Sequence, residues 1–151
     1  MRSWIKWGFI GVIGLAALQV VAEHGVENKS SSPSKAEETA HRAIASLKQK
    51  PYWADVTTTE ADGRHFSLVL HYKSFPPRGM IDADLDTKSV ARAVLAELVK
   101  EGHQPARDSI SIFVWAQQDG LRGETGKPLV RVFGDAVYNY NTDQISFEPQ
   151  K

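Results

Sequence analysis

The stretch from Arg64 to Lys73 alternates between two kinds of side chain, and this alternation constrains the fold more than any other feature of the sequence. Every second position holds a large apolar residue: Phe66, Leu68, Leu70 and Tyr72. The positions between them hold His65, Ser67, Val69 and His71. Because successive side chains of a β-strand point to opposite faces of a sheet, the pattern predicts a strand with one face against a core.

Further strands are expected on both sides of this one. The β-branched run Val56–Thr59 and the turn sequence at residues 61–63 predict a β-hairpin with the alternating strand. Residues 109–117 alternate with apolar side chains on both faces, which indicates a strand near the middle of the sheet. A glycine-rich loop is expected at residues 119–127. Beyond it, residues 129–140 predict the longest strand and residues 145–147 a short final one.

The first helix is expected to begin at a capping box. Ser34 and Glu37 have the required spacing, in which the serine accepts from the third helical N–H and the glutamate reaches back to the cap. The apolar stripe that follows is rich in alanine, so this helix can lie close to the layer it covers. Pro51 is expected to end the helix.

A second helix is expected at about residues 87–101. Asp84 or Asp86 is the predicted N-cap, and Gly102 supplies the stop. The order of elements is therefore α-β-β-α-β-β-β, with no helix between the last three strands. Short connections favour antiparallel pairing, so the sequence predicts one α+β domain at residues 34–151. We expect two layers, a mainly antiparallel sheet with both helices on one face.

The start of the chain has a different character. Arg2 and Lys6 precede an apolar run from Trp7 to Leu18, which is typical of a signal peptide. Val20 and Ala22 fit a cleavage site before Glu23. Tryptophans near the basic end would instead suit an uncleaved helix that anchors the protein in the inner membrane. Residues 1–22 are therefore predicted to be a signal peptide or membrane anchor, and residues 23–33 a flexible, serine-rich tether.

Either form of the leader places the domain outside the cytoplasm, in the periplasm or beyond it, and its brevity suggests a bacterial envelope. The sequence has no cysteine, so the core alone must stabilise the exported domain. The full chain carries 18 basic and 18 acidic side chains. This balance argues against a nucleic-acid partner, because binding to phosphates depends on excess positive charge.

Several motifs resemble known chemical sites but lack a residue or an arrangement that those sites require. Residues 82–86 carry an aspartate at every second position, as a calcium-binding loop does. An EF-hand, however, needs glycine and glutamate at the positions that Thr87 and Ala93 occupy here. Residues 120–128 resemble a phosphate-binding loop, but a strand follows them rather than a helix. His71 lies too far along its own strand from Ser67 for a hydrogen bond. The sequence therefore identifies no catalytic, cofactor-binding or metal-binding residue.

The two faces of the predicted sheet differ, and this difference is the one functional indication. One face is aliphatic and suits coverage by helices: Leu68, Leu70, Ile112, Val114, Val130, Val132, Gly134 and Ala136. The other is aromatic, and together with Val137 it carries the predicted partner-binding residues: Val69, His71, Phe113, Trp115, Arg131 and Phe133. Exposed aromatic patches of this kind are typical of protein interfaces.

The sequence thus predicts an exported, non-catalytic protein-interaction module that binds another protein or a second copy of itself through the aromatic face. The tether, the loop at Pro76-Pro77 or a curled sheet could instead cover that face. The alternative function is a small envelope hydrolase whose residues converge only in three dimensions. A serine or aspartate beside His71 in a polar pocket would favour the hydrolase.

Overall fold

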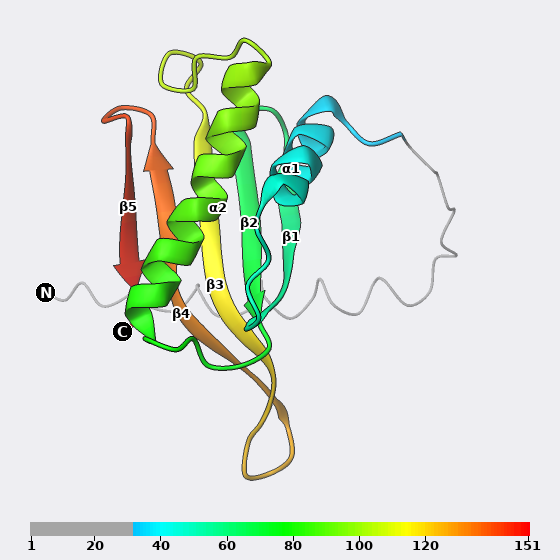
Figure 1. Cartoon of the computed structure of the whole chain (residues 1–151), viewed down its shortest axis with the longest axis vertical. Helices are drawn as coiled ribbons and strands as arrows, with labels where there is room; N and C mark the ends of the chain where they lie inside the picture. The colour runs from blue at the N-terminus through cyan, green and yellow to red at the C-terminus, as the bar shows by residue number, and fades with distance from the viewer. Residues whose placement is uncertain (1–31) are drawn as a thin grey trace, which may run out of the picture. The chain divides into compact units, whose positions relative to one another are not determined.

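A computed structural model describes residues 32–151, so the predicted leader and nearly all of the tether lie outside the described residues. The elements follow the predicted order (Figure 1): α1 (Lys35–Ser46), β1 (Trp53–Ala61), β2 (His65–Tyr72), α2 (Met80–Lys100), β3 (Ser111–Arg122), β4 (Pro128–Asn139) and β5 (Gln144–Pro149). The α+β class is confirmed.

The strands form one sheet in which spatial order equals sequence order, β1-β2-β3-β4-β5. Neighbouring strands are antiparallel except for β2 and β3, which run parallel. The parallel pair follows from connectivity, because α2 carries the chain from the end of β2 back to the start of β3. The sheet is therefore mixed, and β3 lies at its centre as predicted.

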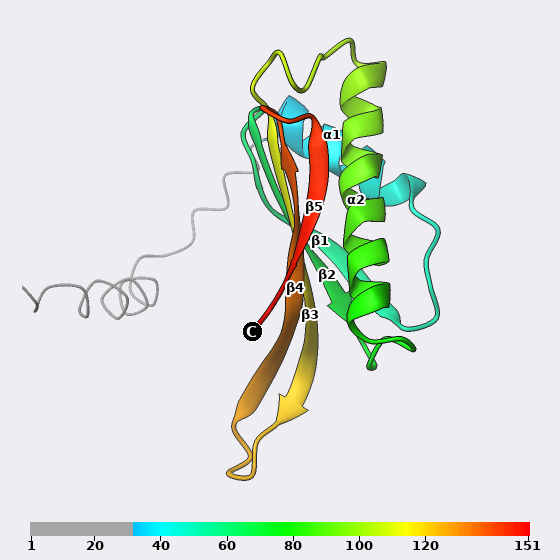
Figure 2. The same ribbon diagram turned by 90° about the vertical axis from the view of Figure 1, so that its left-hand side faces the viewer.

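Both helices lie on the same side of this sheet (Figures 1 and 2), where α1 packs against β1 and α2 against β3, β4 and β5. The core fills the space between the two layers. The predicted inward positions of β2 are all buried there: Phe66, Leu68, Leu70 and Tyr72. The alternation in the sequence thus assigned the faces of this strand correctly.

The capping box at the start of α1 is confirmed. The Glu37 backbone N–H donates to Ser34 Oγ at 3.1 Å, and the Ser34 N–H donates to the Glu37 carboxylate at 2.5 Å. The end of the helix was predicted less well. It ends at Ser46 and not near Pro51, because Leu47 already adopts an extended conformation.

The predicted start of α2 is wrong. The helix begins at Met80, so Asp84 and Asp86 lie inside it and neither is its N-cap. Asp82 acts in the first turn, where its carboxylate accepts from the Arg78 backbone N–H at 2.6 Å. The predicted stop is confirmed, since Gly102 has a φ of 88° that favours glycine.

Asp86 explains why an acidic residue interrupts the buried stripe of α2. Its side chain is fully buried, and its carboxylate accepts hydrogen bonds from Trp53 Nε1 at 3.0 Å and from the Tyr72 hydroxyl at 2.9 Å. Lys50 Nζ forms an ion pair with the same carboxylate. Three donors from around β1 and β2 therefore converge on one acceptor from α2.

The titration of this cluster reflects the same contacts. Burial, reinforced by the Asp86 charge and hydrogen bond, raises the pKa of the Tyr72 hydroxyl. Partial burial lowers the pKa of Lys50, but the hydrogen bond and charge of Asp86 outweigh that effect and raise the pKa overall. Both shifts favour a network in which the Tyr72 hydroxyl is neutral and Lys50 is cationic.

Replacing Asp86 with alanine is expected to lower the free energy of unfolding by about 3–5 kcal/mol, because it leaves buried donors and a cation without their acceptor. Chemical denaturation monitored by circular dichroism measures this change. Ser89→Ala, one turn along the same helix on its exposed side, is the control and should change stability by no more than about 0.5 kcal/mol. Equal stability of the two variants would show that the network does not fix α2.

Candidate functional site

The candidate site is the sheet face opposite the helices, here called the outer face. No helix covers it within residues 32–151, as the edge-on view shows (Figure 2). Its centre is apolar: Val69 of β2 lies directly opposite Trp115 of β3, and Phe113 lies opposite Val137 of β4. Phe113 is 36% exposed and Trp115 is 39% exposed. Two neighbouring aromatic side chains therefore meet the surface.

Four of the six predicted partner-binding residues lie on this face: Val69, His71, Phe113 and Trp115. The predicted placement of Phe133 and Arg131 on this face is wrong. Phe133 is buried at 3% exposure on the helix side of β4, where its ring meets those of Tyr72 and Phe75 edge-on, with centroids 5.4 and 5.5 Å apart. The Arg131 guanidinium lies over the Phe75 ring at 5.5 Å.

A β-bulge causes this reversal. Ala116 pairs with Gly134, but the next residue of β3, Gln117, pairs with Val132, so Phe133 is the extra residue of β4. One extra residue reverses the faces of the side chains on one side of it, here those of Arg131 and Val132, which precede Phe133 in β4. Val132, which was expected under the helices, consequently lies on the outer face.

Gly134 is the sequence signal for this bulge. Its φ is 145°, and a Cβ atom there would collide with the backbone of β5 at Glu148. A glycine inside a strand often marks such an irregularity.

His71 lies at the centre of a chain of hydrogen bonds across three strands. Thr57 Oγ1 of β1 is 2.9 Å from Nε2 of its ring, and Nδ1 contacts the Asp119 carboxylate of β3. Gln117 Nε2 donates to the same carboxylate at 2.8 Å. From the sequence, only Ser67, on the same strand, was considered as a partner for His71. These hydrogen bonds were missed because both partners of His71 come from the neighbouring strands.

The outer face is strongly acidic. All the carboxylate side chains of the five strands lie on it: Asp55, Glu60, Asp119, Asp135 and Glu148. The strands contain no lysine and only two arginines, Arg131 on the helix side and Arg122 near the end of the β3–β4 hairpin. The face therefore combines an apolar centre with an acidic surround.

Asp135 and Glu148 lie directly opposite each other on β4 and β5. Within residues 32–151, neither has a cationic side chain within 4.0 Å. Burial, and then the charge of Glu148, raise the pKa of Asp135. Like charges that lie directly opposite each other on neighbouring strands destabilise a sheet. No cation of the described residues offsets the repulsion between these two carboxylates.

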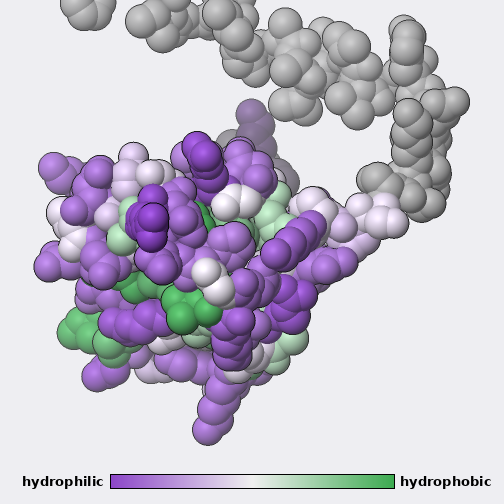
Figure 3. All heavy atoms as spheres, turned by 90° about the horizontal axis from the view of Figure 1, so that it is seen from above, coloured by the Kyte–Doolittle hydropathy of each residue, from purple (hydrophilic) through white to green (hydrophobic). Residues whose placement is uncertain are grey.

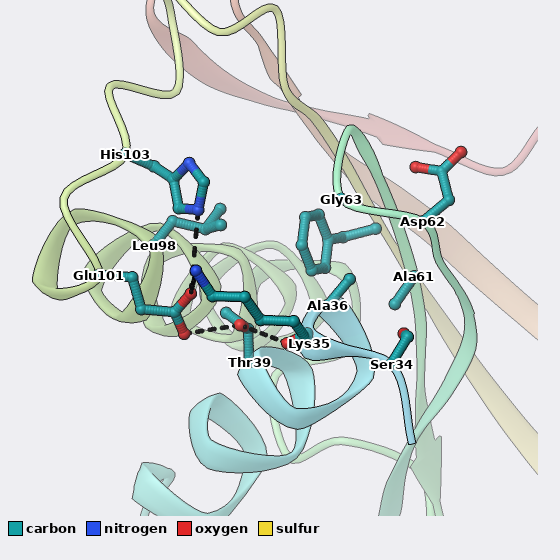
Figure 4. A pocket seen from close by; sticks show the side chains of 11 residues that line it. Ser34, Lys35, Ala36, Thr39, Ala61, Asp62, Gly63, Leu98, Glu101 and His103 are labelled. Carbon is teal, nitrogen blue, oxygen red and sulfur yellow. Dashed lines mark hydrogen bonds and ion pairs between the residues drawn. The ribbon is translucent and has the colours of Figure 1, made fainter. Parts of the chain in front are cut away.

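A cavity of about 290 Å³ lies elsewhere, between the start of α1, the β1–β2 turn and the end of α2 (Figure 4). Phe66 and Leu98 contribute apolar walls. One of its two lining carboxylates, Glu101, already accepts from the Thr39 hydroxyl at 2.6 Å and from Arg42, and these partners lower the pKa of Glu101. Glu101 therefore ties α1 to α2. Seen from this end, the surface is mainly hydrophilic with small separate apolar areas (Figure 3).

Two further findings concern ions and membranes. Within the described residues, no cluster of three or more histidine, aspartate and glutamate side chains is arranged to hold a metal ion. The acidic residues at positions 82–86 lie within α2, where the Asp84 carboxylate forms an ion pair with Lys88 at 2.6 Å. No helix within residues 32–151 is long and apolar enough to cross a membrane.

Comparison of the chain with models of known protein families, with curated proteins and with solved structures finds no significant match. The geometry of the outer face is therefore the basis of the functional argument.

Proposed function

We propose that this protein is an exported, non-catalytic interaction module of the bacterial cell envelope that binds a partner protein through its outer face. The observation that carries the proposal is the exposed pair Phe113 and Trp115 on a sheet face that no helix of residues 32–151 covers. Aromatic side chains supply large contact areas and are enriched at the centres of protein interfaces.

The position of the two aromatics favours an interface over a chance exposure. They belong to β3, the central strand, and are flanked by Val69 on β2 and Val137 on β4. A partner that lies across the middle of the sheet would contact all four side chains at once. Clustered apolar contacts surrounded by polar groups are the usual arrangement of an interface core and its rim.

The charges on the face favour a different protein over a second copy of this chain. Two outer faces in contact would bring two sets of carboxylates together. Juxtaposed like charges oppose association, whereas a partner of opposite charge gains from them. We therefore infer a heterologous complex.

Export is supported by the leader, in which a basic start is followed by an apolar run and a polar tether. The positive charges of Arg2 and Lys6 would remain in the cytoplasm, while the domain would cross to the other side. Retention of the leader would hold the interaction module at the inner membrane. Cleavage before Glu23 would release it.

A second candidate function is hydrolysis, and the chain Thr57–His71–Asp119 is the observation that favours it. A hydroxyl, an imidazole and a carboxylate in this order are the parts of a hydrolytic triad, in which the Thr57 proton would pass to Nε2 of His71. Two features make this candidate the weaker one. The Asp119 side chain is 44% exposed, and none of the three residues lines the cavity of about 290 Å³.

The export proposal makes a direct prediction. A C-terminal fusion to an enzyme that is active only outside the cytoplasm, such as alkaline phosphatase, should be active in a bacterial host. The matching fusion to a reporter that folds only inside should be silent. The reverse result would exclude an exported module, and N-terminal sequencing of the recovered protein would distinguish a cleaved leader from an anchor.

The docking proposal is tested by the double variant Phe113→Ser/Trp115→Ser. Wild-type protein used as bait in envelope extract should retain a protein that this variant fails to retain, since the variant removes the apolar centre of the face. Circular dichroism must show that the variant is still folded.

The matched control is Ile81→Ser/Val99→Ser, which removes two apolar side chains that are each 59% exposed on α2. This control should retain the same protein as the wild type. If both variants retained the captured protein, or if both failed to retain it, the proposal that the outer face binds this protein would be rejected.

The hydrolase candidate predicts hydrolysis of an activated ester such as p-nitrophenyl acetate above the rate with free imidazole. Thr57→Val and His71→Gln should each lower the rate by at least about 100-fold, the scale of a lost catalytic group. Activity that survives both substitutions, or no activity in the wild type, would reject this candidate.

A further inference from the structure

The chemistry of the partner can be specified further, on the basis of the proposed docking function. We propose that the outer face binds a basic amphipathic α-helix of another protein, with its apolar side on Phe113 and Trp115 and its lysine or arginine side chains on the surrounding carboxylates. Nothing in the described chain fills this role.

Charge complementarity gives the first argument. On one flank, Asp135 and Glu148 oppose each other without a cationic neighbour within the described residues. A cation placed between them would relieve their repulsion. Trp115 lies directly opposite Asp135, so the same cation could also approach the indole ring. An arginine or lysine side chain of a partner would therefore interact with the two carboxylates and with the indole ring at once.

The other flank is acidic as well. Asp55 lies opposite His71, and Glu60 lies opposite Ser67, both on the edge strand β1. Asp119 belongs to the central strand β3 rather than to this flank, but its carboxylate contacts His71, the residue opposite Asp55. An apolar strip between two acidic borders matches a partner whose apolar stripe has basic residues on both sides. A neutral or acidic partner would leave these carboxylates desolvated without compensation.

Backbone hydrogen bonding gives the second argument and favours a helix over an extended peptide. The central strands β2, β3 and β4 already pair on both sides, so their N–H and C=O groups are used within the sheet. A segment that lies on the face therefore cannot add to the ladder. It must satisfy its own backbone, as a helix does.

The dimensions agree with this choice. Five strands at about 4.8 Å spacing give a face roughly 19 Å wide between the edge strands. A helix with its side chains is about 10–12 Å wide, so lysine or arginine side chains at its borders would reach the acidic flanks.

Binding of a synthetic probe by the full-length protein tests this inference. The probe is a fluorescein-labelled helical peptide of about 14 residues, roughly 21 Å long, with leucine on one side and lysine along both borders. A matched peptide replaces every lysine with glutamate. Fluorescence anisotropy should show binding of the lysine peptide only, and added salt should weaken it.

The double variant Asp135→Asn/Glu148→Gln should bind the lysine peptide about 3- to 30-fold more weakly, the range for two ion pairs at a surface. Glu38→Gln/Glu124→Gln removes the same charge from α1 and from the β3–β4 loop and should change affinity less than about twofold. Equal weakening in both variants would show that only net charge matters, and would overturn the inference.

The remaining outcomes are also decisive. Equal binding of both peptides, or binding of neither, would reject a basic helix as the partner. The docking proposal would survive that result if Phe113→Ser/Trp115→Ser still lost its captured protein, and it would fail if capture did not depend on these residues. The two proposals can therefore fail separately.

Discussion

The buried carboxylate of Asp86 is the interaction on which the arrangement of this domain depends. It joins α2 to Trp53 at the start of β1, to Tyr72 at the end of β2 and to Lys50 in the segment between α1 and β1. Burying a charge is unfavourable unless its hydrogen bonds are satisfied, and here several donors satisfy them. Because these donors have one common acceptor, the helix cannot slide along the sheet without losing all of them. The network thereby holds α2 on one face of the sheet, and no helix of residues 32–151 covers the other face.

Much of the fold could be predicted from the sequence, because the patterns concerned are local. Strict alternation in β2 assigned its buried face, the capping box gave the start of α1, and Gly102 gave the end of α2. The start of α2 could not be predicted in the same way. A buried aspartate looks like a surface residue or a helix cap until its partners from other elements are known, and those partners lie more than ten positions away.

The candidate site was only partly predictable, for two physical reasons. The side-chain period of a strand is two, so a single bulged residue reverses the face of its neighbours, and this moved Phe133 and Arg131 away from the aromatic face. The partners of His71 belong to strands on either side of its own, and pairing register is not visible in one sequence. Val69, Phe113 and Trp115 were placed correctly because no irregularity separates them from the alternation of their strands.

The parallel pairing of β2 with β3 also has a consequence for how the chain reaches its native state. The strands on either side form two nearly local units, the β1–β2 hairpin and the β3–β4–β5 meander, each made of sequence neighbours. The two units pair along the β2–β3 seam, and the segment that contains α2 separates these two strands in the sequence. Long-range closure of this kind is slow compared with hairpin formation. A nascent chain would therefore expose two incomplete half-sheets, each with an unpaired edge, until β2 and β3 pair.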